Sequence, residues 1–427
     1  MKKTLYLLLL LMALPLTGRA ELTLDHCLDR AEENYPLIHK YGLIEKTAAI
    51  NLSDINKGWL PRISVYAQGT AQNAVPAFPE SMEHLLSQIG QEMKGLGKIQ
   101  YKAGVDVTQT VWDGGASASR RKVERASAEA SASSVAVGMY AVREQVINLY
   151  FGILLMEEQI AQTENTIALL AANHRKLLSM LANGTAMQSD ADMVEAQMLT
   201  MKQQLTQARS SVKGYRNMLA LYIGEDTADS PLLRPAAGMP SDFSPARPEL
   251  AMYEAQTRLN TAREEAVDAT VRPRVGFFAQ AYYGYPGMNY FESMVNRRLS
   301  FNILAGLRLS WDIDSFYTKK NSRRRLALAS ADIENDRELF LFNTRLRTSS
   351  QTEAIDGLKE VIKEDARIVR LRADVRKAAE SQLTNGIIDT TALLGKITDE
   401  NQARITAACH ELQLLQEIYQ LKHTLNR

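Results

Sequence analysis

Three short motifs occur twice in this chain and in the same order, and this internal repeat constrains the fold more than any other feature. The first copies are Trp59-Leu60-Pro61-Arg62, Val111-Trp112-Asp113 and Leu181-Ala182-Asn183-Gly184, and the second copies are Val271-Arg272-Pro273-Arg274, Ser310-Trp311-Asp312 and Leu383-Thr384-Asn385-Gly386. Chance could supply one such recurrence, but hardly three in sequence. The chain is therefore predicted to contain two copies of one structural unit.

A proline-rich segment separates the two copies. Prolines recur through it at positions 231, 235, 240, 245 and 248, and proline interrupts both helices and strand ladders. We therefore predict a first repeat over residues 21–225, a linker over 226–246 and a second repeat over 247–427.

Each repeat is predicted to contain a helix, two strands and a long helical hairpin. The expected ranges in the first repeat are a helix at 24–57, strands at about 61–75 and 99–112, and a hairpin tip near 182–187. In the second they are a helix at 247–270, strands at about 273–285 and 300–312, and a tip near 384–389. Asn-Gly suits both tips because these residues tolerate left-handed backbone angles.

The hairpin helices are predicted to be unusually long. From Ala116 to Leu181 there is no proline, and a continuous helix of that length would extend ~100 Å at 1.5 Å per residue. Tyr317 to Leu383 is a comparable stretch. Such helices are typical of coiled coils or of a tube of helices.

The predicted strands alternate between apolar and polar residues. In 101–111, 274–285 and 301–312 the alternation is nearly continuous, and in 62–72 it is weaker. A soluble antiparallel sheet would show the same pattern, but strands of ~9–11 residues are what a tilted membrane strand requires. Asp106 and Arg308 fall on the polar side, which predicts that they face the lumen of a barrel.

All the tryptophans fall at the same end of a predicted strand. Trp59 precedes the first strand, and Trp112 and Trp311 end the second and fourth, which predicts a belt at the membrane interface. Basic clusters follow at 120–122 and 319–325. They are hypothesised to lie near lipid head groups, although an ordinary solvated helix start would read the same way.

Four strands cannot close a barrel, and open sheet edges are prohibitive in lipid. Three chains would supply twelve strands, whereas two would supply eight, which side chains fill. A trimer is favoured, and a tetramer stays open. The predicted fold class is mostly α with a small β part: coiled-coil-like hairpins form a periplasmic α-barrel, and four strands per chain contribute to a shared 12-stranded transmembrane β-barrel.

Residues 1–20 are predicted to be a secretory signal peptide. Lys2 and Lys3 precede the apolar run Leu5–Leu14, and 18–20 reads as a cleavage site. An N-terminal membrane anchor is the alternative. In an exported protein, Cys27 and Cys409 could form a disulfide or stay separate buried thiols.

No catalytic, cofactor or metal site is predicted. The formal net charge is +1, which gives no general attraction to nucleic acid. No histidine pair has the H-x-x-x-H spacing of a metalloenzyme. The segment Gly95-Leu96-Gly97-Lys98 lacks the spacing of a phosphate loop and is expected to be an extracellular loop.

The chain resembles the TolC-like outer-membrane efflux family over its whole mature length. Six segments are similar to the family's motifs: Leu22 to Pro36, Trp59-Leu60-Pro61, Gln109-Thr110-Val111-Trp112-Asp113-Gly114-Gly115, Leu181-Ala182-Asn183-Gly184, Arg247-Pro248-Glu249-Leu250 and Leu383-Thr384-Asn385-Gly386. The resemblance implies a homotrimeric channel in the outer membrane of a Gram-negative bacterium, with a large periplasmic portion.

The resemblance also implies partners and a role. The channel would be an exit duct for drugs, small toxic molecules or secreted proteins, coupled through a periplasmic adaptor to an inner-membrane transporter and surrounded by outer-membrane lipid. The tips would contact the adaptor through Asn183, Gly184, Thr185, Asn385, Gly386 and Ile387. The sequence does not specify the substrate or the class of pump.

The chain departs from the family at two places. Trp311-Asp312-Ile313-Asp314-Ser315 lacks the double glycine, and 391–395 lacks the acids that close some members. Asp389, Leu393 and Leu394 are the candidate periplasmic gate. Two other functions are weighed against a pump-coupled duct: a periplasmic coiled-coil structural or interaction protein without a pore, and a stand-alone porin, which the long helices disfavour.

Overall fold

The computed structural model describes residues 21–90, 95–228 and 230–427, so the predicted signal peptide lies outside it. The chain divides into two compact units. The helical unit comprises the residues up to Tyr41, Ala132–Met252 and Asn335–Arg427. The sheet unit comprises Gly42–Ser131 and Tyr253–Glu334. Each unit therefore contains parts of both predicted repeats.

The N-terminal helical segment is broken, so the single helix expected over 24–57 is wrong. It consists of α2 (Leu24–Asn34), a 3-10 turn η1 (Pro36–Ile38) and α3 (His39–Lys57). Tyr35 is extended, with φ −66° and ψ 129°, because the ring of a following proline disfavours the helical conformation. The side chain of Thr23 caps α2 by accepting from the backbone N–H of His26 at 3.2 Å.

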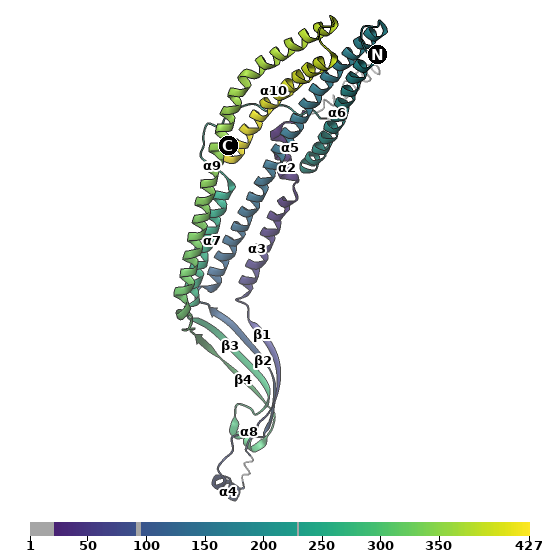
Figure 1. The fold of residues 1–427 in the computed structure, drawn as a ribbon. Helices are drawn as coiled ribbons and strands as arrows, with labels where there is room; N and C mark the ends of the chain where they lie inside the picture. The colour runs from purple at the N-terminus through teal and green to yellow at the C-terminus, as the bar shows by residue number, and fades with distance from the viewer. Residues whose placement is uncertain (1–20, 91–94, 229) are drawn as a thin grey trace, which may run out of the picture. The chain divides into compact units, whose positions relative to one another are not determined.

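Two helical hairpins dominate the chain (Figure 1). The first is α5 (Ala116–Ala182, 67 residues) followed by α6 (Gln188–Ile223). The second is α9 (Ser315–Thr384, 70 residues) followed by α10 (Thr390–Leu425). A separate helix, α7 (Pro248–Thr270), precedes the second pair of strands. Among the described residues, no helical stretch is apolar for long enough to cross a bilayer.

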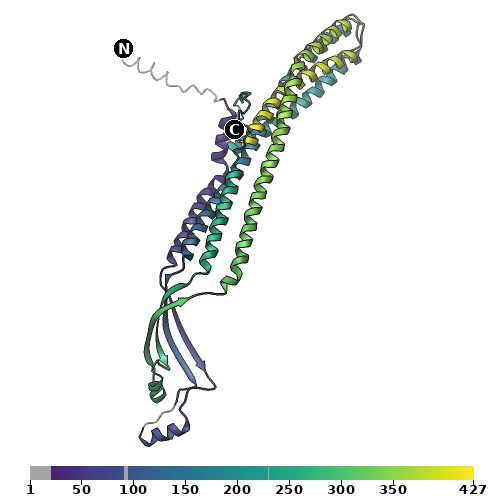
Figure 2. The ribbon, with the colours of Figure 1, turned by 90° about the vertical axis from the view of Figure 1, so that its left-hand side faces the viewer.

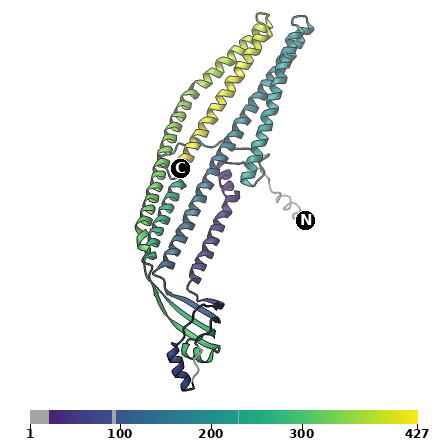
Figure 3. The same ribbon diagram turned by 60° about the horizontal axis from the view of Figure 1, so that its bottom comes forward.

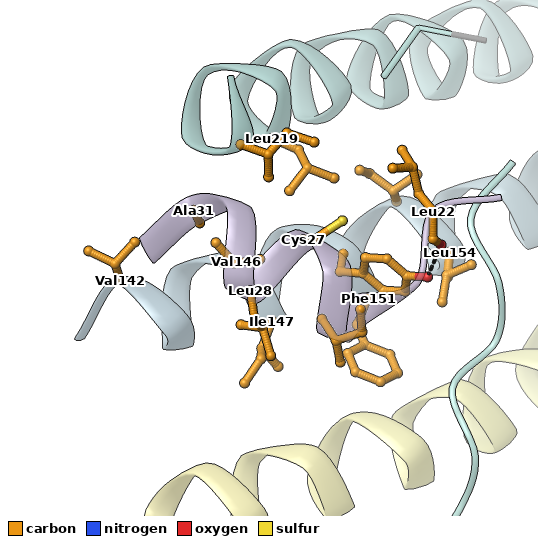
Figure 4. Packing of buried hydrophobic residues seen from close by; sticks show 14 of the residues in the cluster. Leu22, Cys27, Leu28, Ala31, Val142, Val146, Ile147, Phe151, Leu154 and Leu219 are labelled. Atoms are coloured by element: carbon orange, nitrogen blue, oxygen red, sulfur yellow. Dashed lines mark hydrogen bonds between the residues drawn. The ribbon is translucent and has the colours of Figure 1, made fainter. Parts of the chain in front are cut away.

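The main core of the helical unit lies where α2 packs against α5, α6 and α10 (Figure 4). Tyr150 and Phe151 of α5 are fully buried there. Cys27 is buried in the same cluster, and burial raises the pKa of its thiol to about 12. Cys27 and Cys409 are both free thiols.

The segment 226–246, predicted to be a linker, is fixed to this core. Leu22 and Leu232 form a parallel β-bridge. The hydroxyl oxygen of Tyr150 lies 2.7 Å from the carbonyl oxygens of both Leu22 and Leu233, which share its one proton. The backbone N–H of Leu233 also donates to the carbonyl of Leu22 at 3.1 Å, so the proline-rich segment is part of the packed unit.

The sheet unit contains four antiparallel strands in the order β1-β2-β3-β4 (Figure 2). They are β1 (Arg62–Ala71), β2 (Ile99–Trp112), β3 (Arg274–Tyr285) and β4 (Ser300–Ser310). The central pair, β2 and β3, joins the strands of the two predicted repeats. Strands β1 and β4 are the edges.

Two short helices that were not predicted lie in the connections between strands. They are α4 (Glu80–Gln88) and α8 (Tyr290–Asn296). Leu96, in the segment expected to be an extracellular loop, is buried against Tyr285 and Met294. The backbone N–H of Gly97 donates to the hydroxyl of Tyr285 at 2.6 Å. This connection is therefore packed onto the far end of the sheet.

Candidate functional site: the sheet faces and the hairpin tips

The register of the sheet places residues of opposite chemistry on its two faces. One face, here called the polar face, carries every charged residue of the four strands: Arg62, Lys102, Asp106, Arg274 and Arg308. The other, here called the apolar face, carries no charge along the described strands. Asp106 and Arg308, the predicted lumen residues, therefore lie on the same face.

The apolar face carries large exposed side chains. Val65 is 80% exposed, Leu307 72% and Leu309 69%. A water-soluble sheet would bury its apolar face against a core and turn the polar face to solvent. Within the described part of this chain no core covers these side chains, and their arrangement suits a sheet whose outer solvent is apolar.

The polar face holds a network of hydrogen bonds and cation–ring contacts. The side-chain amide of Gln280 donates to Asp106 Oδ1 at 2.8 Å and to the hydroxyl of Tyr66 at 3.0 Å. The ammonium of Lys102 lies 5.4 Å from the centre of the Tyr282 ring. These contacts between neighbouring strands give the polar groups partners on the chain itself.

The tryptophans lie at the end of the sheet from which the long helices leave. Trp112 and Trp311 are about half exposed, at 46% and 54%. The indole N–H of Trp311 donates to the carbonyl of Val271 at 2.9 Å. Gln109, the one polar residue that interrupts the apolar face of β2, donates to the carbonyl of Trp59 at 3.3 Å. The polar side chain of Gln109 therefore stabilises the connection between α3 and β1.

Several side chains of the basic clusters pair with acids of α7. Lys122 contacts Glu265 at 2.5 Å. Lys319 and Arg323 contact Asp268 at 3.0 and 2.7 Å, and Lys319 lowers the pKa of that carboxyl. The sequence alone did not reveal these pairs because Lys122 and Glu265 are 143 positions apart. Lipid contact by the clusters stays a hypothesis for their remaining members.

Figure 3 shows the two hairpin tips. The helix that precedes each tip, α5 or α9, ends in the same way. Gly184 and Gly386 have φ angles of 70° and 71°, a left-handed conformation that favours glycine. The backbone N–H of Thr185 donates to the carbonyl of Met180, and that of Ile387 to Gln382, each at 2.9 Å. This is the Schellman ending of a helix. Thr185 and Ile387 are exposed.

Two of the three candidate gate residues have structural roles that the sequence analysis missed. Asp389 caps α10 by accepting from the backbone N–H of Ala392 at 2.7 Å, a role that an aspartate before a helical run could have suggested. Leu393 is fully buried among residues of all four hairpin helices. Leu394 is partly buried against the same cluster. Gating by Asp389, Leu393 and Leu394 stays a prediction.

Comparison with known proteins gives matches among solved structures only. No protein-family model matches the chain, and no curated protein matches its sequence. The outer-membrane channel OprN superposes with a TM-score of 0.69 at 14% identity, over 94% of this chain and 89% of OprN. The outer-membrane protein VceC from Vibrio cholerae gives 0.67 at 11% identity, over 94% and 95%. The CmeC outer-membrane channel of Campylobacter jejuni gives 0.65 at 13%, over 94% and 85%.

This chain has the fold of the TolC-like outer-membrane channels. The predicted fold class, mostly helical with a small antiparallel sheet, is confirmed. The similarity extends over nearly the whole chain, so the TolC-like fold includes both the sheet and the hairpins. At identities below a fifth, it is the fold that is shared.

Proposed function

We propose that the chain is one subunit of a trimeric outer-membrane channel that serves as an exit duct for efflux or secretion. The observation that carries the proposal is the sheet, whose apolar face is exposed and has no charge along the described strands, and whose polar face has every charge of those strands. Such a sheet matches lipid on one side and water on the other.

The edges of the sheet support assembly from several copies. In a single chain β1 and β4 each have one neighbour, so each leaves one row of backbone groups unpaired along the described strands. Within lipid those groups have no water to bind. Pairing β4 of one copy with β1 of the next would satisfy both rows, and three copies would close a barrel of twelve strands with room for a passage.

The helices support the same assembly. On α9, Leu339, Phe342 and Leu346 are exposed at 55%, 54% and 56%. Further along, Ile368, Leu371 and Val375 repeat the spacing of three and four residues, each at least 45% exposed. This spacing gives an apolar stripe along one side of a helix. A helix of a neighbouring copy is the natural partner for it.

The hairpin tips are the proposed contact with a periplasmic adaptor, which would join the duct to an inner-membrane transporter. In support, both tips carry exposed residues on rigidly ended helices, including Ile387 at 69%. The channel would then lie in the outer membrane of a Gram-negative bacterium, with the hairpins in the periplasm.

The test compares two substitutions at neighbouring positions of β4. Ile303 lies on the apolar face and is 62% exposed; Leu304 lies on the polar face and is 46% exposed. Ile303→Lys should place a charge in lipid, at a cost of about 2–4 kcal/mol near the bilayer midplane. Leu304→Lys removes a similar side chain but should face water.

The full chain would be expressed in a Gram-negative host, and outer-membrane content, trimer mass in detergent and planar-bilayer conductance would be measured. We expect a conducting trimer from the wild type and from Leu304→Lys, with strongly reduced membrane assembly for Ile303→Lys. A water-soluble protein that tolerates both substitutions would support the coiled-coil alternative and overturn the proposal.

A further inference from the structure

A cavity of about 470 Å³ lies in the sheet unit, at the end of the sheet nearest the helices. Four arginines line it: Arg62, Arg120, Arg274 and Arg308. Three of them belong to the polar face of the sheet, and Arg120 lies on the early turns of α5. The channel fold by itself does not require four guanidinium groups in one place.

These arginines have no acidic partner among the described residues. Of the acids that line the cavity, Asp54 is 3.3 Å from Lys57. Asp113 caps α5 by accepting from the backbone N–H groups of Gly115 and Ser117 at 2.9 and 2.6 Å. Both carboxylates are therefore engaged elsewhere, and the cavity keeps an excess of positive charge.

The polar face as a whole carries an excess of positive charge, which comes from the arginines of the cavity because Lys102 and Asp106 balance each other. Along the described strands its four cations are Arg62, Lys102, Arg274 and Arg308, and its one acid is Asp106, which is bound by Gln280. The guanidinium of Arg308 lies 4.9 Å from the centre of the Phe278 ring, which restricts its position while leaving its N–H groups available. Opposite Arg308 in the register is Gly276, which has no side chain to fill the space.

We propose that this cavity is an anion site on the polar face, which binds solutes bearing carboxylate, sulfate or phosphate groups and makes the duct selective for anions. This inference rests on the proposed function, the exit duct, and specifies the class of solute that the duct would pass. Guanidinium groups bind such oxyanions through paired, charge-assisted hydrogen bonds. A surface of one sign also concentrates ions of the opposite sign before they bind.

Lipid phosphates and solute phosphates share this chemistry. The arginines of the strands lie on the face opposite the apolar one, so a dissolved anion is the occupant expected. A lipid phosphate reaching the site would remain bound to the purified protein and would be found by phosphorus analysis of it. That result would overturn the solute assignment.

The experiment measures the reversal potential of the purified full-length protein in a planar bilayer under a potassium chloride gradient. We expect the wild type to favour chloride. The variant carrying Arg62→Gln, Arg274→Gln and Arg308→Gln should lose most of that preference, while Asp106→Asn should increase it. The matched variant with lysine at the same three arginine positions keeps the charge and should keep the preference for chloride.

Inorganic phosphate provides a second readout. It should block chloride current in the wild type, and the block should weaken in the lysine variant, which lacks the paired N–H geometry. If the glutamine variant does not assemble, Arg274→Gln alone provides a smaller shift in the same direction.

The outcomes separate the two proposals. If the wild type conducts but prefers potassium, or if none of these substitutions changes its selectivity, the anion site is overturned and the proposal of a channel still stands. A protein that never conducts overturns the channel and the anion site together. A third outcome is that the glutamine variant dissociates, while the lysine variant stays a trimer but has no preference for chloride. This result would assign the arginines to contacts between copies and overturn the anion site.

Discussion

The core of the helical unit and the sheet of the other unit use the same kinds of residue in opposite ways. Phe151 and Leu393 are fully buried in the helical unit, whereas Leu307 of the sheet is 72% exposed. In water, exposing so many large apolar side chains on one surface would be costly. The proposed function accounts for the difference: the apolar side chains of the helical unit pack against one another, and those of the sheet would contact lipid.

The strongest way to sharpen this comparison is to truncate one residue in each region. Phe151→Ala should destabilise the folded protein by about 3–5 kcal/mol, because it removes a buried ring and leaves a cavity. Leu309→Ala, at a side chain 69% exposed within the chain, should cost far less. Thermal unfolding of the two variants in detergent measures the difference, and equal losses would show that Leu309 is also part of a protein core.

A smaller effect is expected at the hairpin tips. Gly184→Ala should cost about 1–2 kcal/mol because it forces a side chain into the left-handed region. Gly214, inside α6, has open space within 4 Å of the position that a Cβ would take, so Gly214→Ala should instead stabilise the helix by about 0.5–1 kcal/mol. Hydrogen exchange of the α5 and α6 amides would detect opposite changes. Matching changes would mean that the turn does not depend on glycine.

The smallest effect concerns acid. His423 is 6% exposed and stacks on Tyr140 with ring centres 4.4 Å apart. Burial, aided by the positive charge of Arg247, lowers the pKa of this histidine below its ordinary 6.5. Below that pH the unfolded chain binds a proton that the folded chain does not, so stability is complete above pH 6.5 and falls as the pH drops below it.

The check is the melting temperature between pH 5 and pH 7 for the wild type and for His423→Gln. Glu144 faces the same ring and should stay ionised over this range. Burial raises the pKa of its carboxyl, but the hydrogen bond from Arg347 outweighs burial, so the pKa lies below the ordinary value of 4.5. The wild type should lose stability toward pH 5 more than the variant does. Parallel curves would remove His423 as the source.

The sequence predicts the fold class well because its signals are local. Alternation sorts each strand into two faces, and an Asn-Gly pair marks each tip. The break at Pro36 also had a local signal, since proline restricts the residue before it, but the prediction treated 24–57 as one helix. The cap formed by Asp389 had a local signal too, an aspartate before a helical run. The buried position of Leu393 depends instead on the helices that pack around it, which the pattern of one helix does not contain.

The long-range features of the site could not be predicted in the same way. The arginine cavity requires the register that places Arg62, Arg274 and Arg308 at one end of one face, together with the approach of α5. In the sequence analysis each arginine is named separately, Arg308 as a lumen residue and Arg120 in a basic cluster, and they are not brought together. The pairing of Lys319 and Arg323 with Asp268 was likewise invisible until α7 and α9 were placed side by side.

The central claim, that the apolar face meets lipid and the polar face meets water, is tested most directly by labelling two adjacent positions of β4. Leu307→Cys and Arg308→Cys would be made in a chain whose native Cys27 and Cys409 are replaced by alanine. Both positions are exposed in a single chain. In intact outer membranes, a water-soluble maleimide should label position 308 and leave position 307 unlabelled. Equal labelling of both would contradict the account.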